Sequence, residues 1–454
     1  VGGGCFVTGN DTAPPLLKSN ADPIPEPLPP SRIPESLRAL RHHNYRLFMY
    51  GQVVSVVGMW IQSTVQQWLV YTLTGSALLL GLVGFAAQLP MLLFALWAGV
   101  LAENMDRHRV IKVTQTLGML QALVLAGLTL ARGADGGPLI GYWHIFALAV
   151  FMGVVQSFDM PVRQAFLVQM VPRADLGNAV ALNSLSFNMA RVIGPMAAGV
   201  MVAWFTGWRP DFPGFGEGVC FLVNAATYVA VLFQLWRIKP MPQEMPAMNA
   251  RRGQLGQALR YVWGAPHLSS MMILVALVAM FGLPYLMLMP VFAKSVFNGD
   301  IGTNASLMSS IGVGAILGGV AMARRKRIRG LGRMIAIMLL LFSVAATGFA
   351  WSQNLLVARL TLVAAGMCIV CTMIGAQSLL QLLVADEYRG RVMGLYTMAS
   401  MGFMPFGSLM VGALADRIGP REALTACGIV CFAVAVWLWQ RMPAIRDRKS
   451  TRLN

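Results

Sequence analysis

The feature of this sequence that most limits its fold is a series of apolar runs, each about 20 residues long and almost free of charge. A helix of that length spans the hydrocarbon core of a bilayer. Hydrophobic residues make up 57% of the chain and charged residues only 12%, roughly half the charged share of a soluble domain. The sequence therefore predicts an all-α membrane protein.

Twelve apolar spans can be drawn, at residues 47–72, 78–101, 110–131, 142–168, 179–205, 217–236, 268–292, 304–323, 333–351, 355–383, 390–414 and 421–440. A longer polar stretch with a short helix-compatible segment separates the sixth span from the seventh. We therefore expect two six-helix bundles, with boundaries at 1–46 (N-terminal tail), 47–237 (N-terminal bundle), 238–267 (cytoplasmic linker), 268–440 (C-terminal bundle) and 441–454 (C-terminal tail).

The first 46 residues predict a disordered tail, because prolines alternate through a polar segment that cannot build a core. The chain begins with Val and lacks a short basic and apolar leader, which indicates a fragment or a misplaced start. The first span is then expected to act as its own insertion signal.

Basic residues alternate between the loops, although the net charge of +17 alone would suggest nucleic acid. With both tails inside, 28 of the 35 Lys and Arg residues fall on the inner side and five on the outer side. Cytoplasmic loops collect such residues in membrane proteins. The pattern predicts a multi-pass protein of the bacterial inner membrane with both termini in the cytoplasm, and no nucleic-acid partner.

The two halves of the chain repeat one another in part. A shift of 213 residues places Gln164, Val171, Gly177, Leu182 and Gly199 on the identical residues Gln377, Val384, Gly390, Leu395 and Gly412. Spans four and five therefore match spans ten and eleven, as in transporters built from parallel repeats.

The loop after the second span places a small residue, acids and bases in a fixed order: Gly99, Glu103, Asp106, Arg107 and Arg109. Small residues let helices approach, and the charges can pair across an interface and latch one conformation. An ordinary basic cytoplasmic loop would also explain them.

This loop resembles the signature between helices two and three of the major facilitator superfamily. The Ser76-Ala-x-x-x-Gly81 and Pro161-x-Arg-Gln-Ala165 runs are similar to its bacterial drug- and siderophore-exporter branch, which includes enterobactin exporters and macrolide efflux proteins. The likeness covers residues 43 to 440. Two positions depart from it, Glu103 where the family has Asp and Asn104 where it has Arg, so the latch is expected to be weaker or rewired.

Span five contains Arg191, Gly194, Pro195 and Gly199 within about two helical turns. This run resembles the Gly-Pro-x-x-x-Gly signature in helix five of proton-driven exporters, where a kink shapes the gate. The resemblance implies export rather than import. Tight packing of small residues is the alternative explanation.

A second match to the loop signature occurs at Gly412-Ala-Leu-Ala-Asp416-Arg417-x-Gly419-x-Arg421. It follows span eleven, which the distribution of Lys and Arg places on the outer side. We therefore interpret it as the end of a helix and a turn.

Charges inside spans are costly and are presumed functional. Asp159 precedes Arg163 by four residues in span four, and is a candidate proton-coupling or gating carboxylate, although an intrahelical ion pair would explain both residues. Arg191 is expected to contact Asp159, to hold an anionic substrate or to reach toward the cytoplasm, and the first of these is preferred.

Uncharged polar residues within the spans suit a central cavity, although hydrogen bonds between helices would explain each one equally well. The candidates are Gln62, Gln66, Gln88, Gln156, Asn183, Asn188 and Gln377. The 31 Met residues suit an adaptable cavity or serve as apolar filler.

The resemblance implies a secondary transporter that exports a drug, siderophore or similar amphiphile by alternating access, with protons as partners and the proton gradient as energy source. No cofactor, metal site or catalytic residue is expected, since Cys368-x-x-Cys371 lacks His partners and no nucleotide-binding loop occurs. The protein is expected to act as a monomer among membrane lipids. A lysophospholipid or lipid carrier of the same fold is the alternative, with a membrane enzyme far behind.

Overall fold

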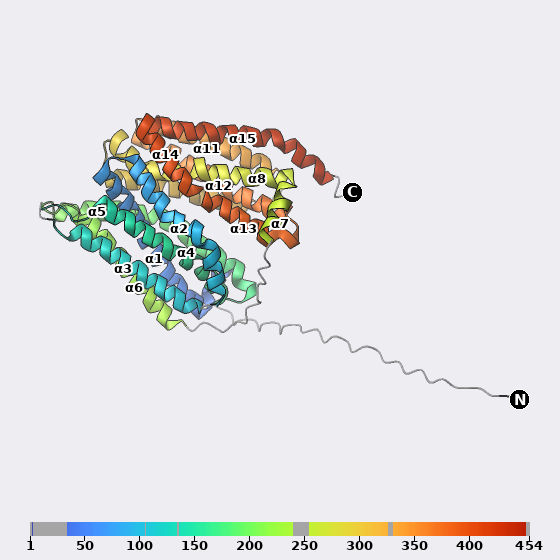
Figure 1. The fold of residues 1–454 in the computed structure, drawn as a ribbon, viewed down its shortest axis with the longest axis horizontal. Helices are drawn as coiled ribbons and strands as arrows, with labels where there is room; N and C mark the ends of the chain where they lie inside the picture. Colours follow the sequence, from blue (N-terminus) through green and yellow to red (C-terminus); the bar gives the residue numbers. More distant parts are fainter. Residues whose placement is uncertain are drawn as a thin grey trace.

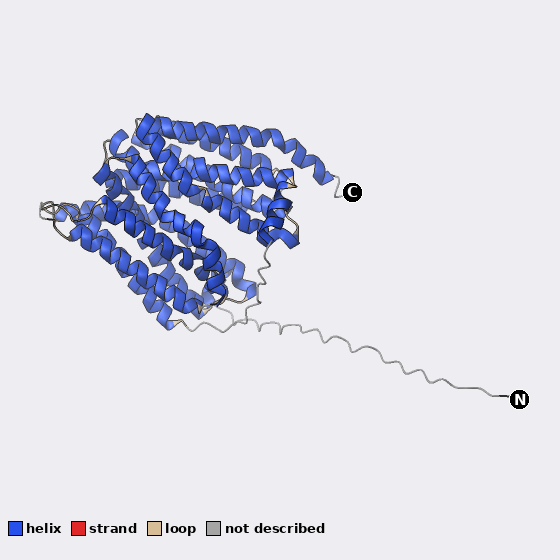
Figure 2. Ribbon diagram, in the orientation of Figure 1, coloured by secondary structure: helices blue, strands red, loops and turns tan. Residues whose placement is uncertain are grey.

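A computed structural model describes residues 2, 34–104, 106–133, 136–238, 254–325 and 330–450, with side chains at all of these except 36, 95–104, 254, 255, 386 and 442–450. The described part of the chain is almost entirely helical (Figure 2). The helices form an N-terminal and a C-terminal group that lie side by side (Figure 1). The all-α, two-bundle architecture predicted from the sequence is therefore confirmed.

Six long helices make up the N-terminal bundle. They are α1 (His43–Thr74), α2 (Ala77–Asn104), α3 (Arg107–Leu130), α4 (Tyr142–Val168), α5 (Arg173–Trp208) and α6 (Phe215–Arg237). Helix α1 packs against α5 and α6, α2 packs against α4, and α3 packs against α4 and α6.

The C-terminal bundle follows a short helix, α7 (Gln254–Trp263). Its first span is broken into five pieces, and the rest are longer helices. The pieces are α8 (Pro266–Leu277), η2 (Val278–Gly282), η3 (Leu283–Leu288), α9 (Met289–Val291) and η4 (Phe292–Val296). The longer helices are α10 (Ile301–Arg324), α11 (Leu331–Ala350), α12 (Leu355–Leu383), α13 (Asp386–Gly402), α14 (Met404–Ile418) and α15 (Pro420–Ser450).

Eleven helical segments of the described chain are long and apolar enough to cross a membrane. Helix α1 is not among them, because its glutamines lower its hydropathy, yet it is 32 residues long and packs inside the N-terminal bundle. Large apolar side chains point outward, with Trp204 73% and Trp236 78% exposed. Such a surface suits lipid, so with α1 as the twelfth span the chain is a multi-pass membrane protein.

The ends of the bundles differ from those expected. A 3-10 helix, η1 (Glu35–Arg41), precedes α1, which itself begins at His43 rather than at residue 47. Arg38 and His42 both pair with Asp175 of α5, at 2.9 and 2.7 Å, and these contacts hold η1 and the start of α1 against α5. At the other end α15 continues past residue 440 to Ser450. Residues 3–33, 239–253 and 451–454 of the expected tails and linker lie outside the described residues.

Spans seven and eleven are not the continuous helices that the sequence predicts. In span seven, Pro284 and Pro290 remove backbone donors, and π and 3-10 turns replace part of the α-helix. Span eleven breaks at Phe403, two residues before Pro405, which divides α13 from α14. Both breaks lie in the C-terminal bundle, and both spans contribute to the cavity described below.

The two bundles meet through glycines at one end of the molecule. Gly81 of α2 faces Gly412 of α14, and Gly199 of α5 faces Ala305 of α10. A missing side chain lets the backbones approach closely at each crossing. Toward the other end, where α7 lies, the two groups of helices diverge (Figure 1).

Replacing Gly153 by Ala is expected to destabilise the N-terminal bundle by about 1–2 kcal/mol. A Cβ at this position of α4 would overlap the carbonyl oxygen of Ala87 in α2, and backbone cannot move aside easily. Gly127→Ala is the matched control, because a Cβ there meets nothing within 4 Å. Thermal unfolding in detergent should show a lower midpoint for Gly153→Ala alone, and equal midpoints would contradict this packing.

Candidate functional site

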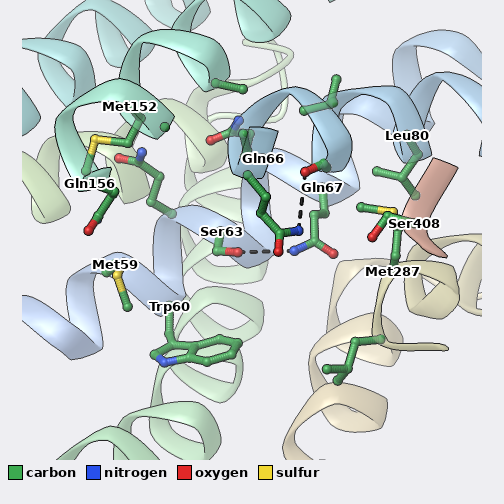
Figure 3. A pocket seen from close by; sticks show the side chains of 18 of the residues that line it. Met59, Trp60, Ser63, Gln66, Gln67, Leu80, Met152, Gln156, Met287 and Ser408 are labelled. Atoms are coloured by element: carbon green, nitrogen blue, oxygen red, sulfur yellow. Dashed lines mark hydrogen bonds between the residues drawn. The ribbon is translucent and has the colours of Figure 1, made fainter. Parts of the chain in front are cut away.

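A cavity of about 350 Å³ lies between the two bundles (Figure 3). Its wall comes from α1, α2, α4 and α6 on one side and from η3, α10 and α14 on the other. The volume lies in the lower part of the range for small-molecule sites. The boundary between repeats is also where secondary transporters bind their substrates.

The two walls of the cavity differ in chemistry. The N-terminal bundle supplies every amide of the described lining, together with two hydroxyls and about as many apolar residues. The polar residues are Gln62, Ser63, Gln66, Gln67, Gln88, Gln156, Asn224 and Tyr228, and the apolar ones include Met59, Trp60 and Met152. The C-terminal bundle supplies Leu283, Pro284, Leu286, Met287, Met308, Met404 and a single hydroxyl, that of Ser408. Figure 3 shows Met287 and Ser408 across the cavity from Met152 and Gln156. None of the described lining residues carries a formal charge, so the cavity suits an amphiphile.

Helical spacing in α1 brings its contribution together. Met59, Ser63, Gln66 and Gln67 recur at three and four residues and therefore form one stripe along the helix. The Gln67 amide donates to the Ser63 hydroxyl at 3.1 Å, which holds both side chains against the cavity (Figure 3). Trp60, one position from this stripe, also lines the wall.

Gln62 ties three helices together beside the cavity. Its amide donates to Gln121 of α3 at 2.9 Å, and its carbonyl oxygen accepts from Asn224 of α6 at 2.7 Å. Gly58 lies directly beneath Asn224 and Thr227, which lets α6 approach α1. This buried polar network orients the amide-rich wall.

Replacing Gln62 by Leu is expected to destabilise the protein by about 1–2 kcal/mol, because buried partners at Gln121 and Asn224 lose their hydrogen bonds. Gln66→Leu removes an amide of the same wall with no described hydrogen bond and should leave the melting midpoint near that of the wild type. Thermal unfolding of the two variants compares them. Equal decreases of the melting midpoint in the two variants would show that the hydrogen-bond network of Gln62 contributes nothing to stability.

Some of the polar residues predicted from the sequence to line a cavity do so, and others do not. Gln62, Gln66, Gln88 and Gln156 line the cavity. Asn183 and Asn188 of α5 and Gln377 of α12 are not among its described lining residues. Asn188 instead donates to the Ser184 carbonyl of its own helix, at 2.9 Å. The sequence candidates omitted Trp60 and Tyr228, since a lone aromatic residue in an apolar span looks the same whether it faces lipid or a cavity.

Asp159 and Arg163 form a buried ion pair within α4, with a shortest distance of 2.6 Å. The second carboxylate oxygen of Asp159 accepts from Thr114 at 2.6 Å and from Gln115 at 3.0 Å, both on α3. Arg163 also donates to Gln52 of α1. The carboxylate is therefore fully engaged, one turn of α4 from the cavity residue Gln156.

The pair between Arg191 and Asp159 that was preferred from the sequence does not form. All described partners of Asp159 lie on α3 and α4, whereas the Arg191 guanidinium lies over the Trp60 ring, 5.3 Å from its centre. The sequence offered two partners for Asp159, Arg163 four residues away on α4 and Arg191 on α5, and it could not show which face α5 turns toward α4. Arg163, on the same helix, takes the carboxylate.

The sequence profile of the transmembrane secretion effector family, a branch of the major facilitator superfamily, matches residues 35–453. The chain belongs to this family. Its fold and its relatives are those of transporters rather than of enzymes. The resemblance inferred from the signature loop and from helix five is thereby confirmed.

Among the relatives of this chain are a siderophore-named transporter and a multidrug efflux pump. The staphyloferrin A transporter of Staphylococcus aureus is 24% identical over 89% of this chain and 98% of its own length. The multidrug efflux pump Tap of Mycolicibacterium fortuitum is 24% identical over 86% of this chain and 93% of its own length.

Solved structures share the fold at low identity. A bacterial homologue of the human lysosomal transporter Spinster, in an inward-facing and occupied conformation, has a TM-score of 0.69 and 13% identity over 90% of this chain and 98% of its own. A D-xylose-proton symporter has a TM-score of 0.68 and 14% identity over 86% of this chain and 97% of its own. These likenesses show the major facilitator fold.

The residues of the helix-five motif face neighbouring helices. Gly194 lies against Trp60 of α1, and Gly199 lies against α10 of the other bundle. Pro195 is buried, and α5 continues through it as one helix from Arg173 to Trp208. The motif thus lets α5 contact α1 and the C-terminal bundle at once.

The structure describes the signature loop in part. Asp106 caps α3 by accepting from the backbone of His108 at 3.0 Å and of Arg109 at 3.4 Å. Arg107 donates to the Ala165 carbonyl of α4 at 3.3 Å, within its own bundle. Gly99 and Glu103 belong to α2, and their side chains lie outside the described residues. In the described part, the bond from Arg107 to Ala165 and the contacts of Asp106 stay inside the N-terminal bundle.

The second match to the signature does end a helix, as expected, with α14 stopping at Ile418 before a left-handed Gly419. The sequence did not reveal its further contact. Asp416 caps α2 of the opposite bundle, accepting from the Ser76 hydroxyl at 2.5 Å and from the backbone of Ala77 at 2.6 Å and Leu78 at 3.1 Å. A carboxylate at a helix N-terminus is stabilised by the unpaired backbone donors there. Asp416 therefore fastens the two bundles together at this end.

Proposed function

We propose that this transporter exports a small organic amphiphile by alternating access, driven by the proton gradient. The observation that carries the proposal is the uncharged cavity between the bundles, with all of its described amides on one wall and an almost wholly apolar wall opposite. A ligand with a polar and an apolar side would bind both walls. The names of the relatives, a siderophore transporter and a multidrug efflux pump, support export.

The direction follows from the proposed orientation in a bacterial inner membrane. We place the end that carries α7 in the cytoplasm, because Lys and Arg are concentrated on that side of the spans. The bundles are fastened at the opposite end, by Asp416 and by the glycine crossings. The cavity would then receive its substrate from the cytoplasm and release it outside once these contacts open.

Proton coupling is assigned in this proposal to Asp159, with Arg163 as its partner. The pair is buried in α4, and Gln156, one turn before Asp159 on the same helix, lines the cavity. Protonation of the carboxylate would release Arg163 and disturb the links to α1 and α3. Such a link would connect proton binding to the cavity wall.

Efflux from cells that lack their major pumps tests the proposal. We expect export of at least one member of a panel of dyes, siderophores and lysophospholipids, with loss of export when an uncoupler is added. Gln66→Trp should block transport by filling the cavity, whereas Val124→Trp, on the exposed face of α3, should not. Export of lysophospholipid alone would favour a lipid carrier, and transport that resists the uncoupler would contradict proton coupling.

A further inference from the structure

Arg191 lies at the boundary between the bundles, near the middle of α5. The Ser309 hydroxyl of α10 donates to the carbonyl of the next residue, Val192, at 3.0 Å. On the same face, a Cβ added at Gly312 would lie 3.1 Å from the Arg191 carbonyl oxygen. The backbone of Arg191 is therefore held against the C-terminal bundle, while its side chain extends toward Trp60 of the N-terminal bundle.

Three hydrogen-bond donors at this place have no partner. The Nε of Arg191, the Nε1 of Trp60 and the hydroxyl of Tyr285 are all buried and make no hydrogen bond within the described structure. The guanidinium is 5.3 Å from the centre of the Trp60 ring, and Tyr285 lies on η3 between Pro284 and Leu286, which line the same cavity as Trp60. Tyr285 itself is only 1% exposed.

The chemistry of the cluster indicates what is missing. Arginine and tryptophan nitrogens can only donate, and the tyrosine hydroxyl has its proton available. Among the described residues, no carboxylate forms an ion pair with Arg191. An unpaired cation and unmatched donors are costly inside a membrane protein. An oxyanion would satisfy all three donors and the charge together.

The cluster borders the transport cavity. Trp60 forms part of the cavity wall, and so do Pro284 and Leu286 on either side of Tyr285. The Trp60 ring, which a ligand in the cavity would contact, is therefore also the ring over which the guanidinium lies. The described lining itself is uncharged, and Arg191, over the Trp60 ring, is a cation beside it that no described carboxylate pairs with.

We propose that Arg191, Tyr285 and Trp60 form a subsite for an oxyanion, the carboxylate-type acid group of the transported molecule. The inference rests on the proposed export function and adds a substrate class to it, that of organic acids with an apolar body. The amide and thioether walls hold the body, and the subsite holds the acid.

Binding of a matched acid and amide to the purified protein in nanodiscs tests the subsite. We expect wild-type protein to bind 2-naphthoate at least about tenfold more tightly than 2-naphthamide, as befits a hydrogen-bonded charge. Arg191→Gln should reduce this preference to within about twofold, Arg191→Lys should keep part of it, and Tyr285→Phe should weaken it. Arg359→Gln is the matched control, because Arg359 is an in-span arginine that donates to Ser306 away from the cavity lining.

Two further measurements separate the possible failures. If chloride protects the protein from heat as well as 2-naphthoate does, in an Arg191-dependent way, the site holds an inorganic ion and the substrate class is wrong. If vesicles export 2-naphthamide as fast as 2-naphthoate and Arg191→Gln changes neither rate, export stands and the acid subsite is overturned. If 2-naphthoate binds through Arg191 but no panel compound is exported, the subsite stands and the proposed function fails.

Discussion

Asp159→Asn is expected to abolish uncoupler-sensitive efflux. Asn keeps the hydrogen bonds from Thr114 and Gln115 but cannot take up a proton or balance the charge of Arg163. Breaking a buried ion pair by removing one partner costs about 3–5 kcal/mol, so the single variant should also melt at a lower temperature. Substrate accumulation in cells, with and without uncoupler, and thermal unfolding measure the two effects.

The double variant Asp159→Asn with Arg163→Gln separates proton coupling from structural support. It removes both charges and should regain most of the lost stability while efflux stays absent. Asp211→Asn, at an exposed carboxylate near Arg209, serves as the control and should transport normally. Proton-dependent efflux at the wild-type level in the double variant would reduce the pair to a structural role.

Asp416→Ala is expected to shift the conformational equilibrium toward the state in which the α2 and α14 ends separate. The variant loses the cap of α2 and the bond from Ser76, which together contribute about 2 kcal/mol, equivalent to roughly a 30-fold change in the equilibrium. Export should slow, because the state that admits substrate is less populated.

Spin labels at position 207, in the exposed last turn of α5, and at position 298, in the exposed loop before α10, would report this shift as a longer distance. Asp416→Asn keeps one acceptor oxygen and should fall between the wild type and Asp416→Ala. Glu422→Ala, in the first turn of α15, is a control that leaves the cap of α2 intact. An unchanged distance distribution in Asp416→Ala would mean that the glycine crossings alone close this end.

The membrane fold could be predicted because two of its causes are local. Apolar length and the placement of Lys and Arg are properties of short segments, and they identified twelve spans in two sets. The breaks at Pro284 and Phe403 were missed, since a proline within an apolar run is compatible with a kink or with a continuous helix. Only the packing of the neighbouring helices decides between them.

The site was predictable only in its composition. Amides along α1 could be recognised as cavity candidates, because their spacing is helical and α1 is one element. Asn183 and Asn188 of α5 and Gln377 of α12 are also polar residues in apolar spans, but they are not among the described lining residues. A single sequence does not show which side of a helix faces the partner bundle. The link from Asp416 to Ser76 joins residues 340 positions apart, which a local motif cannot show.

The unequal walls of the cavity affect how the protein would tolerate different cargoes. Amides on α1, α4 and α6 require matching hydrogen-bond donors and acceptors in the ligand. The N-terminal bundle should therefore be selective for the polar end of the transported molecule. The opposite wall carries Met287, Met308 and Met404, whose flexible side chains adapt their shape to the ligand. The structure of the apolar end of the molecule can therefore vary. When the bundles move apart, the substrate should stay bound to the N-terminal bundle. Analogues altered at the apolar end should still be transported.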